Sequence, residues 1–298
     1  MLARKANSKK FVVRQGQTRP RGRQPIFRAT TTRSTLSIAF GMVELIYHSV
    51  VREIRKSHRS AVVGLVLIAA QGALMTLMFF MIFQVLGLRT AKIRGDFFLY
   101  LMSGVFLYMT HNRTVTAVMK APDSTSSMMQ HVPLNPFITI SASAIAALYQ
   151  QVLSLGIILF AYHALFNPIT IDQPAGALAA LLMAWFSGVA VGVIFLAIKP
   201  WAPRLIPILR MVYLRANMIS SGKMFVANTL PSSFLAVFSW NPLFHSVDQA
   251  RGYIFLNYTP HFTSLTYPLY LSLTLLLIGL MLEFFTRQRA SASWSAGA

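Results

Sequence analysis

The chain has 298 residues, of which 55% are hydrophobic and only 11% are charged. A soluble domain carries about a quarter charged residues, so this composition excludes an ordinary soluble protein. The chain contains no cysteine, which excludes a disulfide framework, a zinc–thiolate site and thiol catalysis.

The formal net charge of +20 comes from 27 Lys and Arg residues against 7 Asp and Glu residues. Fourteen of the cations precede residue 60, ahead of the first long apolar stretch. A basic segment in this place is typical of a cytoplasmic anchor attracted to anionic lipid, and we favour it over nucleic-acid binding. Residues 1–40 have too little apolar surface to offset their ordering entropy, so we expect a disordered basic cytoplasmic tail.

Residues 41–59 predict an amphipathic helix that is too polar to cross a membrane. Apolar positions such as Val43, Ile46 and Val50 recur at spacings of three and four, and polar residues occupy another face. We expect this helix to lie along the cytoplasmic interface. It serves either as a membrane anchor or as a protein-docking surface, and the sequence leaves both interpretations open.

Residues 60–286 predict an all-α membrane protein with six transmembrane helices. No charged residue lies between Arg59 and Arg89, between Asp172 and Lys199, or between Arg251 and Glu283. About 20 apolar residues in a helix cross a bilayer core. The expected spans are 61–88, 97–119, 139–165, 176–198, 206–227 and 262–284.

Two other segments complete the predicted topology. Residues 228–260 are rich in aromatic residues and proline, so we expect a re-entrant outer segment of short, half-inserted helices before the last span. Residues 287–298 form a C-terminal tail. Lys and Arg are more frequent in the loops on the side of the two termini, which predicts that both ends are cytoplasmic.

The sequence carries no pattern of an enzyme. None of the seven carboxylates lies in the middle of a predicted span, and none is spaced as a metal-binding pair. Hydrolase, metalloprotease and P-loop motifs are absent. We therefore expect no catalytic residue, no metal and no cofactor. Ion-coupled transporters usually keep an intramembrane acid, so the energy for transport would come from another chain.

Two features allow a polar route for a solute. Arg215 is the deepest charge of the predicted spans, where it either contacts an anionic solute or extends its charge to the interface. Aromatic residues of the outer half, including Trp240 and Tyr253, form either an interfacial belt or a surface on which sugar rings pack.

The order of motifs resembles the permease of type-2 ABC exporters, and most closely the permeases that export capsular polysaccharide. The resemblance covers residues 42–286 and rests on short strings in a common order. These are Arg52-Glu53-Ile54-Arg55, Gly104, Asn112-Arg113, Met183-Ala184-Trp185-Phe186, Ser221-Gly222, Leu230-Pro231, and Trp240-Asn241-Pro242 followed by Asp248 and Arg251. The chain departs from the family at Gln71-Gly72, where members often have Glu-Pro.

The resemblance implies a homodimer in the bacterial inner membrane with two ABC ATPase subunits docked on its cytoplasmic side. The ATPases bind the ATP, and periplasmic and outer-membrane export proteins complete the route. The interface helix and a coupling loop at 121–135 meet the ATPases through Glu44, His48, Arg52, Arg55, Asp123, Ser124, Met128 and Gln130. The expected contacts with an acidic, lipid-linked polysaccharide are Arg113, Arg215, Arg251, Trp240 and Tyr253.

Other functions stay open at this point. Within the same class, the cargo is another lipid-linked glycan, such as O-antigen or teichoic acid, or a drug. Alternatives from other classes are an integral membrane acyl- or glycosyltransferase and a membrane scaffold with a basic arm.

Overall fold

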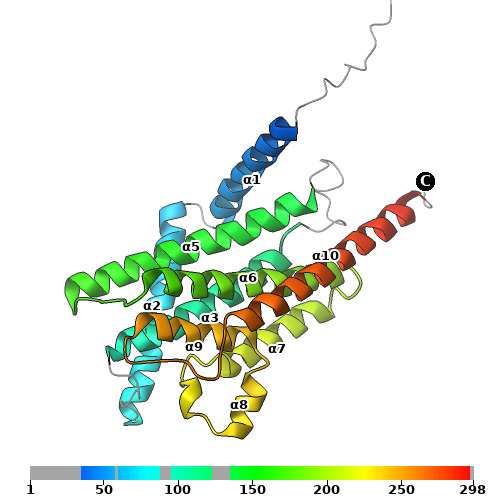
Figure 1. Cartoon of the computed structure of the whole chain (residues 1–298). Coiled ribbons are helices and arrows are strands. Elements are labelled where there is room, and N and C mark those ends of the chain that lie inside the picture. The colour runs from blue at the N-terminus through cyan, green and yellow to red at the C-terminus, as the bar shows by residue number, and fades with distance from the viewer. Residues whose placement is uncertain (1–34, 58–59, 88–94, 123–134, 296–298) are drawn as a thin grey trace, which may run out of the picture. The chain divides into compact units, whose positions relative to one another are not determined.

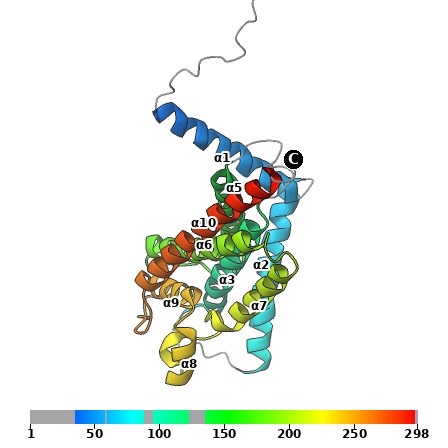
Figure 2. The same cartoon turned by 90° about the vertical axis from the view of Figure 1, so that its right-hand side faces the viewer.

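A computed structural model describes residues 35–57, 60–87, 95–122 and 135–295. The elements of these segments are helical throughout, with nine α-helices and one short 3-10 helix. The described residues from Gly41 onward belong to one compact unit. In two perpendicular views the part of α1 (Thr35–Ser57) from Gly41 onward and the end of α10 (Thr266–Ser295) lie at one end of this unit, and α8 (Ser232–Phe238) lies at the other (Figures 1 and 2).

The amphipathic segment is helical, as expected, but it begins earlier than the sequence predicts. Helix α1 runs over Thr35–Ser57, so residues 35–40, which we assigned to the tail, are helical. The remainder of the predicted tail, residues 1–34, lies outside the described residues. The segment 35–40 has no proline or interior glycine to end a helix.

Within the described residues, four helices are long and apolar enough to cross a membrane. They are α2 (Ala61–Val85), α5 (Pro136–Leu165), α6 (Pro174–Ile198) and α10 (Thr266–Ser295). Helices α2, α5 and α6 correspond to predicted spans with ends that differ by at most three residues. Helix α10 begins four residues after the predicted start and continues to Ser295, so most of the predicted C-terminal tail is helical. These four helices make the chain a membrane-embedded protein.

The predicted second and fifth spans do not meet this standard of length and composition. Helix α3 (Phe97–Met119) has the predicted bounds, but its last turns contain His111-Asn112-Arg113. Most residues of α3 are buried, and it packs against α2, α5, α6, α7 (Leu205–Ser220) and α9 (Pro242–Ile254). A helix enclosed by others does not need a uniformly apolar surface. The surface of α3 is therefore in contact with other helices rather than with lipid.

The predicted fifth span is shorter than expected. Helix α7 (Leu205–Ser220) has only 16 residues, whereas the sequence predicted a span as far as residue 227. Gly222 has a φ of 73°, a left-handed conformation that glycine adopts without steric cost. The chain turns at this point and enters a short 3-10 helix at Ala227–Thr229.

Asparagine and aspartate fix the starts of three helices. Asp96 accepts a hydrogen bond from the backbone N–H of Phe98 at 2.8 Å at the start of α3. Asn135 and Asn241 do the same at the starts of α5 and α9 (Pro242–Ile254), and in both helices proline follows directly. Proline is favourable at the first helical position because its missing N–H has no partner there anyway.

Glycines on α6 bring α3 and α6 into close contact. A Cβ atom at Gly188 would lie 2.7 Å from the carbonyl oxygen of His111, and one at Gly192 would lie 2.8 Å from Cβ of Val118. Both distances are below normal contact, so only glycine permits this approach. The spacing Gly188-x-x-x-Gly192 is therefore a packing motif.

The segment before the last span contains two short helices, α8 (Ser232–Phe238) and α9. Helix α9 is largely buried and packs against α3, α6 and α10, whereas no residue of α8 is buried. The short helices of this segment agree with the sequence. The depth of α9 within the helix bundle does not follow from it.

Candidate functional site

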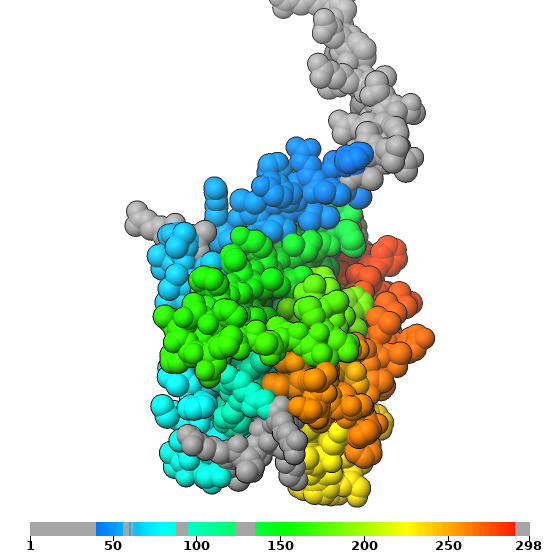
Figure 3. Space-filling view, turned by 60° about the vertical axis from the view of Figure 1, so that its left-hand side comes forward, coloured from blue at the N-terminus to red at the C-terminus, as the bar shows by residue number. Residues whose placement is uncertain are grey.

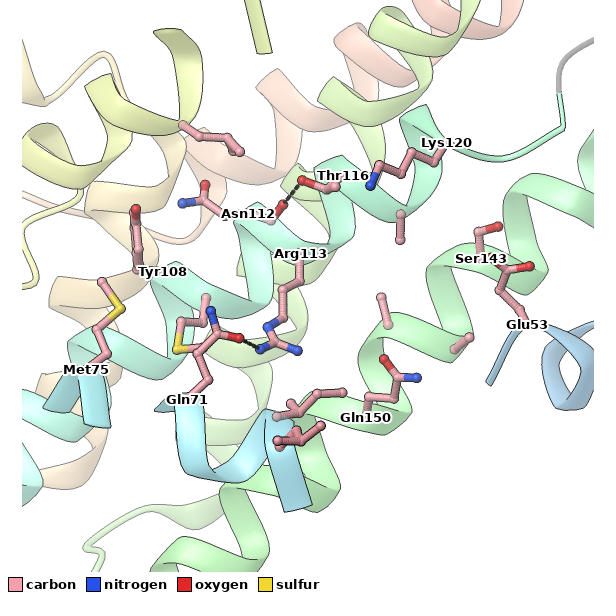
Figure 4. A pocket seen from close by; sticks show the side chains of 17 residues that line it. Glu53, Gln71, Met75, Tyr108, Asn112, Arg113, Thr116, Lys120, Ser143 and Gln150 are labelled. Atoms are coloured by element: carbon pink, nitrogen blue, oxygen red, sulfur yellow. Dashed lines mark hydrogen bonds between the residues drawn. The ribbon is translucent and has the colours of Figure 1, made fainter. Parts of the chain in front are cut away.

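A polar groove of about 700 Å³ lies between α2, α3 and α5 (Figure 4). Glu53 of α1 and Leu214 of α7 also line it. Polar side chains make up about half of the lining, namely Glu53, Gln71, Tyr108, Asn112, Arg113, Thr116, Lys120, Ser143 and Gln150. A groove of this size is within the usual range of ligand sites.

Helical spacing explains why these side chains meet. On α3 the lining residues recur at intervals of three and four from Met109 through Arg113 to Lys120, so they share one face. On α5 the facing residues are Ser143, Ala146 and Ala147. Their small side chains leave the space that the groove occupies.

Arg113 is the central cation of the groove. Its side chain is half-buried, and Nη2 donates a hydrogen bond to Oε1 of Gln71 at 2.5 Å. The close-up shows the guanidinium beside Gln71, with Gln150 on the facing helix (Figure 4). An amide oxygen orients the guanidinium without neutralising its charge. Arg113 is therefore positioned to attract an anion.

The C-terminal end of α3 carries further polar groups. Arg210 of α7 donates from Nη1 to Oγ1 of Thr116 at 3.1 Å, which joins α7 to α3 beside the groove. Oδ1 of Asn112 is buried and has no hydrogen-bond partner. Lys120 is exposed at the end of the helix. Arg113 and Lys120 line the groove with one carboxylate, Glu53, so the lining carries a positive charge.

Arg251, which the sequence predicted as a substrate contact, does not line this groove. Its side chain is fully buried at 0% exposure. The guanidinium donates to the carbonyl oxygens of Gly222, Lys223 and Phe225 at 2.6 to 2.8 Å and lies 4.1 Å from the centre of the Tyr100 ring. It holds the turn after α7 against α9 and α3.

Asp248 completes this buried cluster one helical turn before Arg251. Its Oδ1 accepts hydrogen bonds from the Tyr258 hydroxyl at 2.5 Å and from the Ala227 backbone N–H at 3.3 Å. Its Oδ2 accepts one from the Thr263 hydroxyl at 2.8 Å. Burial, reinforced by the charge of Asp248, raises the pKa of Tyr258 above its ordinary value. We call Asp248, Arg251 and their hydrogen-bond partners the Asp248–Arg251 cluster.

The other predicted substrate contacts are dispersed. Arg215 lies on an exposed face of α7, and Trp240, just after α8, is 79% exposed. Tyr253 packs its ring on Gly176 at the start of α6, where a Cβ atom would lie 2.4 Å from the ring. Of the five predicted contacts, the structure brings only Arg113 into the groove.

The predicted ATPase contacts are divided between described and undescribed segments. Glu44, His48, Arg52 and Arg55 are exposed on α1, and Nε2 of His48 lies 3.8 Å from Oε1 of Glu44. Asp123, Ser124, Met128 and Gln130 lie outside the described residues.

Sequence reasoning missed the position of Lys223. It lies in the predicted fifth span, 206–227, and is not one of the candidate site residues, yet its side chain is only 1% exposed. Its Nζ lies 3.6 Å from the centre of the Tyr108 ring and 4.8 Å from that of Phe79. Aromatic faces attract cations, which makes this burial tolerable. The sequence signal that could have indicated this burial is a lone Lys directly after Gly222, the glycine of the turn.

Comparisons with known proteins do not assign the chain to a family. No family model matches it. No curated protein matches it significantly either.

Proposed function

We propose that the chain is the permease subunit of an ATP-driven exporter that moves a lipid-linked capsular polysaccharide across the bacterial inner membrane. In this proposal α3 and α7 join the four long helices as a six-span domain with both termini in the cytoplasm. Two copies enclose the route, and a separate ABC ATPase binds the ATP.

The observation that carries the proposal is the cationic groove inside an apolar helix bundle. An intramembrane charge is costly and usually serves a solute pathway. Arg113 lies within such a groove and is held by an amide rather than a carboxylate. An acidic polymer or a phosphate-bearing lipid carrier has the complementary charge. In Figure 2, α1 and the end of α10 lie at the same end of the helix bundle, which supports a location of both termini on the same side of the membrane.

Arg215 retains a role in this proposal. It is exposed on α7 beside apolar residues such as Val212 and Ile219, which are 60% and 68% exposed. A second copy that packs along α7 would cover these residues and enclose the charge of Arg215. In that arrangement Arg215 faces the route between the two copies.

The first test is the composition of the complex. The full chain is purified from its native membrane in a mild detergent, and its partners are identified by mass spectrometry. We expect a P-loop ATPase in equal amount and a second copy of the chain. Transfer of an acyl or glycosyl group by the purified chain alone would instead establish the membrane-enzyme alternative.

The second test concerns coupling. Residues 121–135 are replaced by a Gly/Ser segment of equal length in the reconstituted complex. We expect ATP hydrolysis to continue while ATP-dependent movement of lipid-linked polysaccharide is lost, because the loop no longer transmits motion. Unchanged transport would contradict a coupling role for this loop.

A further inference from the structure

A second groove, of about 570 Å³, lies between α1, α2 and α5. Its walls are almost entirely apolar, with Val50 and Ile54 from α1, Leu65 from α2, and Ile145 and Leu153 from α5. It meets the polar groove at Ile68 and Gln150, which line both. The space-filling view shows α1 lying against α5 on this face (Figure 3).

Three helices build this groove from residues at helical spacing. On α1 the lining residues are at positions 47, 50, 51 and 54, and on α5 they are at 145, 149 and 153. The side chains of Val62, Tyr149 and Ile145 are 70%, 53% and 39% exposed. The groove is therefore a concave apolar surface that the described residues leave open.

The lining of this groove includes one charged residue, Arg55. Arg55, near the end of α1, is exposed and lines the groove, whereas no carboxylate does so. Tyr47 and Tyr149 add amphipathic aromatic rings, which favour the boundary between headgroups and acyl chains. An occupant that complements this lining joins a long apolar part to an anionic group.

We propose that this groove binds an anionic phospholipid of the bilayer, with an acyl chain along α5 and the phosphate against Arg55. The protein is embedded in a membrane, so such a molecule is always available. Cations near a membrane surface attract anionic headgroups. The N-terminal residues 1–34 are a poor occupant, because they carry ten Lys and Arg residues and Arg55 repels them.

This binding gives α1 a role that neither earlier interpretation contains. A lipid seated between α1, α2 and α5 fills the gap between the interface helix and the bundle. The apolar face of α1 then packs on a specific lipid rather than on bulk membrane or on a partner protein.

The test measures lipid binding to the purified full chain by native mass spectrometry. Delipidated protein is titrated with phosphatidylglycerol or with phosphatidylcholine of identical acyl chains. We expect phosphatidylglycerol to bind about fivefold more tightly, from the attraction of one cation to an anionic headgroup. Equal affinity for the two lipids would overturn the proposal. Neither an ATPase nor a cargo is present, so the outcome does not depend on the transport proposal.

Matched variants locate the two parts of the lipid. R55Q removes the preference for phosphatidylglycerol, whereas R52Q, which loses a charge on the same helix outside the groove, keeps it. Ile145→Trp fills the groove and weakens binding of both lipids at least fivefold. Ile157→Trp, at a similarly exposed position of α5 outside the groove, does not. If either pair behaves alike, the proposed site is wrong.

Discussion

Arg113 and Arg251 are both arginines in apolar surroundings, and both were predicted to contact substrate, but their environments differ. Arg251 is fully buried, and its guanidinium binds three backbone carbonyl oxygens and faces an aromatic ring. Arg113 is half-buried in an open groove, and one amide oxygen holds it. Both terminal nitrogens of Arg251 are engaged by the fold, whereas Arg113 has donors left for a ligand.

The comparison shows that an intramembrane charge is not by itself evidence of a transport route. A buried guanidinium whose two terminal nitrogens both bind backbone carbonyls stabilises a turn. A guanidinium that lines a cavity is available to an anion. Substitutions in the Asp248–Arg251 cluster should therefore lower the free energy of unfolding more than a substitution in the polar groove. The four variants below run from the largest expected loss of stability to the smallest.

Arg251→Gln should cost the most stability. It leaves the carbonyl oxygens of Gly222, Lys223 and Phe225 without their charged donor, and the expected loss is about 3 kcal/mol or more. Thermal unfolding in detergent measures the effect. Arg287→Gln, at an exposed position of α10, is the control. Equal stability of the two variants would show that the Asp248–Arg251 cluster does not stabilise the fold.

Gly104→Ala should destabilise the same region from the side of α3. The added Cβ atom would lie 2.8 Å from Cα of Lys223 and 2.9 Å from Nη2 of Arg251, so the expected cost is about 1–3 kcal/mol. Gly156→Ala on α5 is the matched control, since nothing lies within 4 Å of its Cβ position. The control should gain a few tenths of a kcal/mol from helix propensity. The idea fails if Gly104→Ala is as stable as the control.

Tyr258→Phe should have a smaller effect that depends on pH. The variant loses the hydrogen bond to Asp248, which costs about 1 kcal/mol at neutral pH. The raised pKa of Tyr258 means that folding favours its neutral phenol. Its contribution is fully present below the ordinary pKa of 10.0 and is lost as the pH rises above that value.

The measurement is unfolding in detergent as a function of pH. Wild type should lose more stability than Tyr258→Phe above pH 10.0, and the two curves should therefore converge. Tyr270→Phe, at a position that is 69% exposed, is the control and should follow wild type. Parallel curves for wild type and Tyr258→Phe would contradict this account.

Arg113→Gln should change stability least, by no more than about 0.5 kcal/mol, because its side chain borders an open groove. It should nevertheless reduce export of an acidic glycan about tenfold, through loss of a charge-assisted contact. Arg204→Gln, exposed near the start of α7, is the control for charge. A strongly destabilised Arg113→Gln, or one with normal export, would remove the distinction between the two arginines.

Much of the helical layout could be predicted from the sequence. The uncharged stretches predicted the four long apolar helices, and the bounds of α3 agree with the prediction. The end of α7 could not be predicted in this way, because apolar residues resume at Met224, only four positions after Ser220. Only the left-handed turn at Gly222 ends the helix there. Hydropathy measures transfer to lipid and contains no information about this turn.

The candidate site was only partly predictable. Arg113 was identified from its neighbour Asn112 and the family resemblance, but Gln71 was noted only as a departure from the family. Their hydrogen bond joins residues on two different helices. Spacing within one helix predicts which residues share a face, but not which face of a second helix is opposite.

By itself, the sequence determined that this protein is helical and embedded in a membrane, because uncharged runs of this length are stable only in apolar surroundings. Tertiary structure alone decided which intramembrane cations are engaged by carbonyls and which face open space. The physical reason is that the hydrogen-bond partners of Arg251 and Arg113 are about 30 and 40 residues away in the chain. Only packing of the helices brings such partners together.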